Sequence, residues 1–267
     1  MALVLQVSDL HVGGHPDPEA EAAEAALHAL VAREAPRLVV ASGDLTHRNR
    51  AEQHAIAAGF LRSLGPPVLA VPGNHDMPAL PPARFTRTFA AFEREWPTRE
   101  PVVAVDGVVA CGICSARPWL YQEGVVTRAQ LDRVHAALAD APLGALRLAV
   151  LHHHLLGAPW RSAKKAVARR HLVVDGLAAA GVEVVVSGHV HQAAVAERRD
   201  FQVGVPPLVV VTCPGLGRPR PSRIGEARGV QLLDADETTI VVRTLVWEAG
   251  TYLQTGERRF ARAAPAA

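Results

Sequence analysis

The sequence has no long hydrophobic run and little net charge, and both absences narrow the class of protein. No apolar stretch reaches the roughly 18 residues that a membrane span requires. Residues 1–7 form a short apolar segment without the basic start of a secretory signal. We therefore expect an unexported, cytoplasmic protein that does not contact a membrane. A formal net charge of +2 over 267 residues indicates no specific nucleic-acid partner.

Cysteine is scarce as well. The chain has three, Cys111, Cys114 and Cys213, an odd number that fits a reducing compartment better than a disulfide framework. The first two form a C-x-x-C pair inside the apolar run VVACGIC, and no second pair accompanies them. A structural zinc site needs more ligands than this. We favour small buried hydrophobic residues over a redox or zinc site.

Lysine is nearly missing, so almost all positive charge is arginine. Four arginines, Arg218, Arg220, Arg223 and Arg228, fall in the Pro/Gly-rich stretch GRPRPSRIGEARG at 217–229. Such a stretch is typical of a solvated loop, and a loop that contacts phosphate is the alternative. On the second interpretation Arg223 is a weak candidate for substrate binding.

The pattern that is present alternates apolar β-branched runs with alanine-rich helical stretches. This alternation predicts βαβ units and a parallel sheet, hence an α/β fold. A hydrophobic content of 49% is enough for one large core, and we expect a single domain over 1–260 with a disordered tail at 261–267. The last quarter reads as antiparallel strands. Expected helices cover about 18–35, 50–63, part of 82–95, a segment opened by a Thr127–Gln130 capping box, and 163–180.

Five of the expected strands are followed by residues of metal-ligand type. Ligand sites in open α/β sheets form at the carboxyl ends of strands, so these loops should converge although they are far apart in the sequence. Each could separately be a capped turn or a buried histidine, but all five together favour a metal site. The residues are Asp9 and His11; Asp44; Asn74 and His75; His152, His153 and His154; and His189 and His191.

The mixture of imidazoles and carboxylates suits zinc, manganese or iron, whereas an all-oxygen set would suit magnesium or calcium. There are more donors than one ion can take, and they fill two sites if one carboxylate is shared. A pair of divalent ions is the usual means of activating water against a phosphorus ester. Because only Asp9 and Asp44 are anionic, the loaded centre stays positive and attracts phosphate.

These residues resemble the motifs of the calcineurin-like metallophosphoesterases, whose signature is D-x-H, G-D, G-N-H-D/E, a histidine motif and G-H-x-H. The resemblance is closest to the small bacterial branch that includes the class III cyclic-nucleotide phosphodiesterases. It implies a four-layer α/β/β/α sandwich with two mixed sheets. The corresponding segments are SDLH (8–11), GDLT (43–46), GNHD (73–76), LHHH (151–154) and GHVH (188–191).

The resemblance also implies a set of ligands. One ion would be held by Asp9, His11, Asp44 and His191, and the other by Asp44, Asn74, His189 and a histidine of the HHH run, with Asp44 as the bridge. Relatives commonly read H-x-P in that run, and Leu155 stands where the proline would be. Alignment on this spacing makes His153 the ligand and leaves His152 and His154 behind the ligands or facing substrate; His154 is the substrate-binding candidate.

The resemblance further implies that His75 is the general acid and that Asp76 orients it. A neighbouring carboxylate can raise the pKa of an imidazole and fix its tautomer, which agrees. The predicted activity is hydrolysis of a small phosphodiester, with cyclic nucleotides among the candidates, by in-line attack of metal-bound hydroxide. A phosphomonoesterase or a nucleotide pyrophosphatase is the alternative, and an inactive scaffold is a remote one. The expected partner is a small phosphoester or nucleotide, and a homodimer is allowed.

Overall fold

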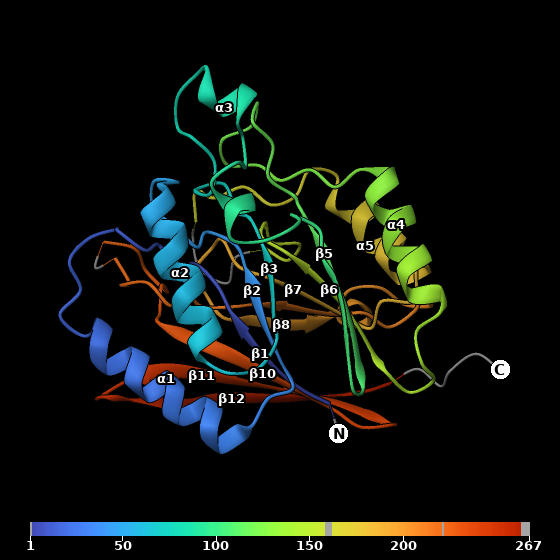
Figure 1. The fold of residues 1–267 in the computed structure, drawn as a ribbon. Helices are drawn as coiled ribbons and strands as arrows, with labels where there is room; N and C mark the ends of the chain where they lie inside the picture. The colour runs from blue at the N-terminus through green and yellow to red at the C-terminus, as the bar shows by residue number, and fades with distance from the viewer. Residues whose placement is uncertain (1, 158–161, 221, 263–267) are drawn as a thin grey trace.

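Two six-stranded sheets form the centre of the protein. The computed structural model describes residues 2–157, 162–220 and 222–262. The order in the first sheet is β12 (Thr251–Ala261), β11 (Thr239–Glu248), β10 (Gly229–Ala235), β1 (Ala2–Val7), β2 (Leu38–Ser42) and β3 (Val68–Val71). The order in the second is β4 (Val102–Val105), β5 (Val108–Ile113), β6 (Leu146–Leu151), β7 (Val184–Ser187), β9 (Val209–Thr212) and β8 (Ala194–Glu197). Both sheets are mixed, which confirms the predicted α/β class (Figure 1).

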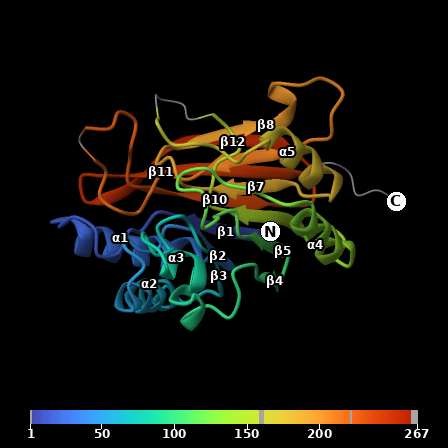
Figure 2. The ribbon, with the colours of Figure 1, turned by 90° about the horizontal axis from the view of Figure 1, so that it is seen from above.

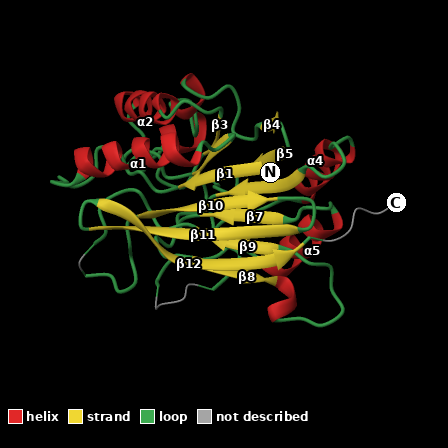
Figure 3. Cartoon of the chain, turned by 90° about the horizontal axis from the view of Figure 1, so that it is seen from below, coloured by secondary structure: helices red, strands yellow, loops and turns green. Residues whose placement is uncertain are grey.

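Three apolar clusters define the layers. Val4, Val40 and Val150 belong to the core between the two sheets, because alternate residues of each strand point to that side. The outer face of the first sheet packs on α1 (Ala20–Glu34) and α2 (Ala51–Ser63), and that of the second on α4 (Arg128–Ala139) and α5 (Arg170–Ala179). In Figures 2 and 3 the two helix pairs lie on opposite sides of the strands. The result is the expected α/β/β/α sandwich.

Helix boundaries follow the sequence where local capping is strong. Thr127 accepts the Gln130 N–H at 3.3 Å while the Gln130 side chain accepts the Thr127 N–H at 2.8 Å, so the predicted capping box opens α4. The helix expected near 82–95 is reduced to α3 (Ala83–Thr86) and a 3-10 turn at Phe92–Arg94. There Arg84 binds three carbonyls of neighbouring loops, and the Thr86 hydroxyl binds a carbonyl of its own turn.

Two further expectations need correction. The helix predicted from 163 begins at Arg170, because the backbone of Val167 and Ala168 bonds instead to the loops at His154 and Gly124. Strand β12 was not predicted, because it is an edge strand with mostly exposed polar residues.

The chain end and the last quarter differ in detail from the sequence reading. β9 runs parallel to β7, whereas the whole segment was expected to be antiparallel. Of the tail predicted at 261–267, Ala261 ends β12 and Arg262 pairs with Glu183 at 2.7 Å; residues 263–267 lie outside the described residues. A 3-10 turn, Arg198–Asp200, follows β8. None of the helices in the described ranges is long and apolar enough to span a membrane.

The sheets bring the carboxyl ends of β1, β2, β3, β6 and β7 to one edge of the sandwich. β1, β2 and β3 are parallel neighbours, as are β6 and β7. Hydrogen bonds join the two sheets at this edge: the Gln6 amide donates to the Ser187 carbonyl at 2.8 Å, and His152 Nδ1 lies 2.9 Å from the Ser42 carbonyl. The five loops with ligand-type residues therefore meet, as the sequence predicted.

Candidate dimetal centre

The first cluster, named site 1, comes from the loops after β1, β2 and β7. His191 Nε2 lies 3.0 Å from Asp9 Oδ1 and 3.2 Å from His11 Nε2. His11 Nε2 is 3.8 Å from Asp9 Oδ1 and equally 3.8 Å from Asp44 Oδ2. Four donor atoms thus point into one small space.

The second cluster, named site 2, comes from the loops after β2, β3, β6 and β7. His152 Nε2 lies 3.3 Å from Asp44 Oδ2, 3.2 Å from Asn74 Oδ1 and 3.1 Å from His189 Nδ1. His189 presents Nδ1 and His191 presents Nε2, so two histidines of one G-H-x-H loop serve different sites.

Asp44 stands between the two sites. Its Oδ2 is the atom within 3.8 Å of a histidine nitrogen of site 1 and 3.3 Å of one of site 2. Its Oδ1 accepts the His75 N–H at 2.8 Å, which fixes the carboxylate plane. One oxygen is therefore anchored and the other is directed to both sites, as a bridging ligand requires.

The donor set fits two divalent ions. Asp9 Oδ2 accepts hydrogen bonds from Ser8 Oγ at 2.6 Å and the His189 N–H at 2.9 Å. Within the described part of the chain, Asp9 Oδ1 and Asp44 Oδ2 are buried and accept no hydrogen bond. Asp9 belongs to the group with His11 and His191, and Asp44 to the group with His152 and His189. A buried carboxylate oxygen without a partner is costly. Imidazole nitrogens and carboxylate oxygens placed this close suit zinc, manganese or iron.

Burial and mutual charge shift the pKa values in the two sites. Burial alone would raise the pKa of Asp44, but His152 and His75 outweigh it and hold that pKa well below its ordinary value. Burial would lower the pKa of His152, but Asp44 beside it raises that pKa to about 9. The carboxylate is therefore ionised, and an ion entering site 2 must displace a proton from His152.

The loops that carry the donors are tightly curved. Left-handed backbone is uncommon for residues other than glycine and concentrates at functional sites. Glycine is required beside the donors too, because a Cβ at Gly73 would lie 2.2 Å from Asp44 Oδ1 and one at Gly188 would lie 2.5 Å from Asp9 Oδ2. The residues with positive φ among the candidate ligands are Asp9 (51°), His11 (48°), Asp44 (51°), His189 (73°) and His191 (56°).

The structure places His152 of the HHH run, and not the expected His153, beside the other donors of site 2. His153 Nδ1 lies 2.8 Å from Ser115 Oγ, and although its ring is 4.7 Å from that of His189, it is His152 that joins Asp44 and His189 in site 2. Along β6, Leu148 and Val150 face the core between the sheets, while Leu151 faces the helices. Because side chains alternate along a strand, His152 continues the inner face and His153 the outer one.

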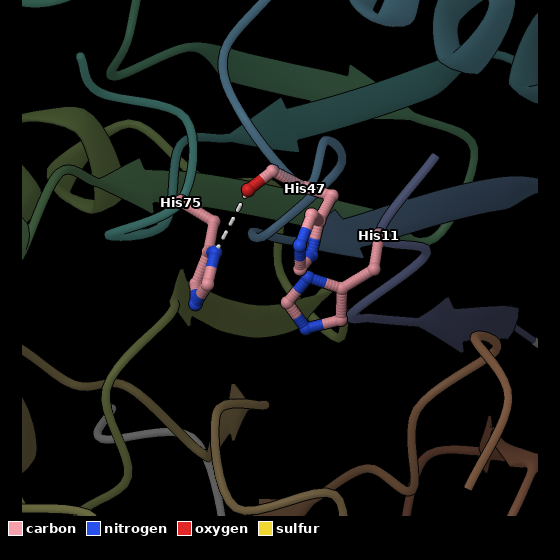
Figure 4. Close-up of side chains that lie close together, drawn as sticks. All are labelled: His11, His47 and His75. Carbon is pink, nitrogen blue, oxygen red and sulfur yellow. Dashed lines mark hydrogen bonds between the residues drawn. The ribbon is translucent and has the colours of Figure 1, made fainter. Parts of the chain in front are cut away.

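His75 lies beside His11 of site 1 and His47 (Figure 4). Its ring is 4.8 Å from that of His11 and 5.7 Å from that of His47, and its Nδ1 is 3.0 Å from the His47 carbonyl. A carbonyl accepts only, so Nδ1 carries a proton and donates it. In the neutral ring, Nε2 is then the basic nitrogen, and both nitrogens carry protons in the imidazolium.

The predicted role of Asp76, to orient the His75 ring, is also corrected. The Asp76 carboxylate is fully buried and accepts hydrogen bonds from the N–H groups of Leu45, Thr46 and Gly73 at 2.9–3.1 Å. It therefore joins the loop that carries Asp44 to the loop that carries Asn74. The His47 carbonyl, and not Asp76, fixes the His75 ring.

Two further residues of the site were missed. His47 forms part of a histidine group with His11 and His75, and burial together with the nearby His75 lowers its pKa. Its only sequence signal is its place directly after GDLT. Lys164, one of two lysines in the chain, donates from Nζ to the His189 carbonyl. It lies on a loop without a motif, so nothing local marked it.

The two residues predicted to bind substrate, His154 and Arg223, do not line the cavity beside site 1. His154 is buried and stacks on His189 at 5.8 Å, and burial together with nearby Arg170 lowers its pKa to about 4. Arg223 is exposed and lies 4.0 Å from Glu226. A cavity does open beside site 1, but it is lined by Arg218, Arg220 and Arg228 of the same loop and not by Arg223.

The five motifs and their geometry agree with the comparison against known families. Residues 2–193 match the family model described as calcineurin-like phosphoesterase. The chain belongs to this family. No match was found among the curated proteins.

Several solved structures share this fold at low sequence identity. A purple acid phosphatase, PPD1, from yellow lupin (Lupinus luteus) seeds is 12% identical with a TM-score of 0.69; the match covers 98% of this chain and 54% of that one. A dimetal phosphatase from Danio rerio is 13% identical over 95% of this chain and 98% of that one, with a TM-score of 0.66. GAP50 of Plasmodium, described as the anchor in the inner membrane complex, is 12% identical over 99% and 90%, with a TM-score of 0.64. This chain thus spans about half of the lupin protein and nearly all of the zebrafish one.

Proposed function

We propose that this protein is a dimetal phosphoesterase that hydrolyses small phosphodiesters, with His75 as the proton donor to the leaving oxygen. The observation that carries the proposal is the single oxygen Asp44 Oδ2 directed to both sites, within 3.8 Å of His11 Nε2 and 3.3 Å of His152 Nε2. When bound, the two ions would supply an activated water for in-line attack and neutralise the phosphoryl oxygens.

His75 is suited to the role of acid by its place and its hydrogen bond. It lies at the edge of site 1, where a leaving group would depart, and it contributes no atom to either site. The His47 carbonyl, 3.0 Å from Nδ1, holds the ring, so Nε2 is available to give a proton to an alkoxide.

Charge around the centre favours a diester over a monoester. A monoester at neutral pH carries an additional negative charge and would benefit from an unpaired guanidinium. Of the three arginines that line the adjoining cavity, Arg220 is neutralised by Glu226 at 2.6 Å and Arg228 is paired with Asp17, while Arg218 donates to the Pro16 carbonyl at 2.7 Å. Two of the three guanidinium charges are therefore already compensated. A phosphomonoesterase or nucleotide pyrophosphatase is the second candidate, since the same ions serve all three reactions.

A third candidate is an inactive scaffold; GAP50, one of the structures with this fold, is described as the anchor in the inner membrane complex. This chain retains every donor of both sites and His75 as well. Such retention is difficult to explain for a protein that only binds a partner.

The test is a metal-dependent assay on matched esters. Purified protein would be stripped with a chelator, reloaded with manganese, iron or zinc, and assayed on bis(4-nitrophenyl) phosphate and 4-nitrophenyl phosphate. We expect activity only after reloading, with the diester preferred in kcat/KM. Preference for the monoester would favour the second candidate, and no turnover of either ester with any metal would favour the scaffold.

The role of His75 is tested by changing the leaving group. His75→Ala should retain both ions and lose roughly 10²–10⁴-fold in kcat on a diester with an alkoxide leaving group. It should lose far less on a nitrophenyl ester, because a nitrophenolate departs without a proton. Equal losses on both, at unchanged metal content, would mean that His75 positions the phosphate and that the proton comes from another group.

A further inference from the structure

A cavity of about 840 Å³ adjoins site 1 and extends away from it between α1, α2 and the arginine loop. Its polar end is formed by His11, His47, His75 and His191. The residues assigned so far to metal binding and proton donation contact the cavity only at this end. The remainder is much larger than a phosphate group needs, so the substrate has room for a sizeable second substituent.

Beyond the histidines, many of the residues that line the cavity are apolar. α1 contributes Ala23 and Leu27, which are buried, and Tyr252 of β12 closes the inner wall at 7% exposure. The other apolar lining residues are Leu10, Val12, Pro16, Ala20, Ile56, Phe60, Leu216 and Pro219. Walls of this composition bind apolar groups and exclude strongly hydrated ones.

Among the charged residues that line the cavity, Arg228 is buried, whereas Asp17, Glu24, Arg218 and Arg220 are half-buried or exposed. Arg228 is 3% exposed, and its Nη2 pairs with Asp17, but its Nε and Nη1 are buried and have no hydrogen-bond partner among the residues that the structure describes. Leaving buried guanidinium N–H groups unpaired is costly, and native proteins rarely do so without a reason. A ligand that carries an acceptor would satisfy them.

The backbone places Arg228 beside the metal loops. The preceding residue, Ala227, donates its N–H to the His191 carbonyl at 3.1 Å, and the following one, Gly229, donates to Gly215 at 3.0 Å. The guanidinium therefore belongs to the wall that continues directly from site 1. Because Asp17 already compensates its charge, an uncharged acceptor suits it better than a second phosphate.

We propose that this cavity binds the substituent of the phosphoester that is not the leaving group, and that this substituent is largely apolar, uncharged and equipped with a hydrogen-bond acceptor for Arg228. The proposal rests on the proposed phosphoesterase function. Two sources share this chemistry: the base of a nucleoside, with its ring carbonyls, and an acyl chain, with its ester carbonyl.

The test uses four 4-nitrophenyl diesters that differ only in the retained substituent: methyl, octyl, thymidin-5′-yl and octanoyloxyethyl. All release the same nitrophenolate, so differences in kcat/KM report binding of the substituent. We expect the three large esters to exceed the methyl ester by roughly 10–100-fold, the range for burial of about 100 Å² of apolar surface. The thymidinyl and octanoyloxyethyl esters identify the source by which of them is faster.

Two variants separate shape from hydrogen bonding. Ala20→Phe, at the cavity wall on α1, should lower the ratio of large to methyl ester by about 10-fold or more. Ala25→Phe is the matched control, because Ala25 is exposed on the same helix and lies outside the cavity; its ratio should be that of the native protein. Arg228→Met should lower kcat/KM for the acceptor-bearing esters relative to octyl by about 10-fold.

A readout without turnover completes the design. Calorimetric titration of the metal-loaded protein with thymidine monophosphate, octyl phosphate and methyl phosphate should show weaker binding of the first two in Ala20→Phe and not in Ala25→Phe. If Arg228→Met fails to fold, as judged by Tm, the Ala20 pair decides alone. Equal kcat/KM for all four esters overturns this inference and leaves the phosphoesterase intact, whereas no hydrolysis of any ester with any metal overturns both.

Discussion

Replacing His152 and His153 separately by alanine tests the assignment of site 2. The two residues are adjacent, chemically identical and both almost fully buried, at 0% and 1% exposure. His152 Nε2 lies within 3.3 Å of donor atoms of Asp44, Asn74 and His189, whereas His153 Nδ1 lies 2.8 Å from Ser115 Oγ. Their different surroundings predict a large loss of metal binding for His152→Ala and a small change for His153→Ala.

The magnitude follows from what each substitution removes. Loss of a hydrogen-bonding partner behind a metal ligand commonly weakens metal binding by about 10–100-fold. His152→Ala removes a donor of site 2 itself, so we expect a loss above about 100-fold for one ion, or about 2.7 kcal/mol. His153→Ala leaves every donor in place and should change affinity within about 10-fold. Both variants lose a buried ring, so both should have a lower Tm.

The assay measures metal content after dialysis against a chelator of graded strength, with both variants folded as judged by circular dichroism. We expect the native protein and His153→Ala to retain two equivalents and His152→Ala to retain one. The reasoning from strand alternation is refuted if His153→Ala loses an equivalent while His152→Ala keeps both.

Three shorter predictions follow from other contacts. Asp44→Ala should lose at least one metal equivalent together with activity, because both sites lose an anionic oxygen; two full equivalents by elemental analysis would contradict the bridge. Asp76→Asn should lower the Tm by about 2–4 °C or more and weaken metal binding, because an amide nitrogen cannot accept hydrogen bonds from the N–H groups that the carboxylate binds. A native Tm and native metal affinity would show that the loops of Asp44 and Asn74 do not depend on this connection. Burial would raise the pKa of Glu34, but Arg243 at 2.8 Å outweighs it and holds that pKa below its ordinary value. The contact therefore stabilises the fold above the ordinary pKa of glutamate and is lost as pH falls through the lowered value, so Glu34→Gln should lower the Tm by about 1–3 °C at neutral pH and not in acid.

The sequence alone placed the donors at the ends of strands. β1, β2 and β3 are short apolar runs followed by SDLH, GDLT and GNHD. This local sequence pattern is enough to predict a strand, a turn and a polar loop. Convergence then follows from the general rule that carboxyl ends of parallel strands share an edge. The ligand types, their shared carboxylate and the family could therefore be inferred without coordinates.

The tertiary structure decided which role each of two adjacent residues in a motif takes. His152 and His153 are adjacent histidines that the sequence does not distinguish. Only the orientation of β6 in the sandwich directs His152 to Asn74 in site 2 and His153 to Ser115. Asp76 and His75 are adjacent in sequence, yet the fold commits the carboxylate to backbone groups of another loop. Arg228 meets Asp17 across 211 residues of chain, which no local pattern encodes. Spacing along the chain fixes residue types near a site, but side-chain direction and long-range partners depend on how the two sheets pack, and that is a property of the folded chain as a whole.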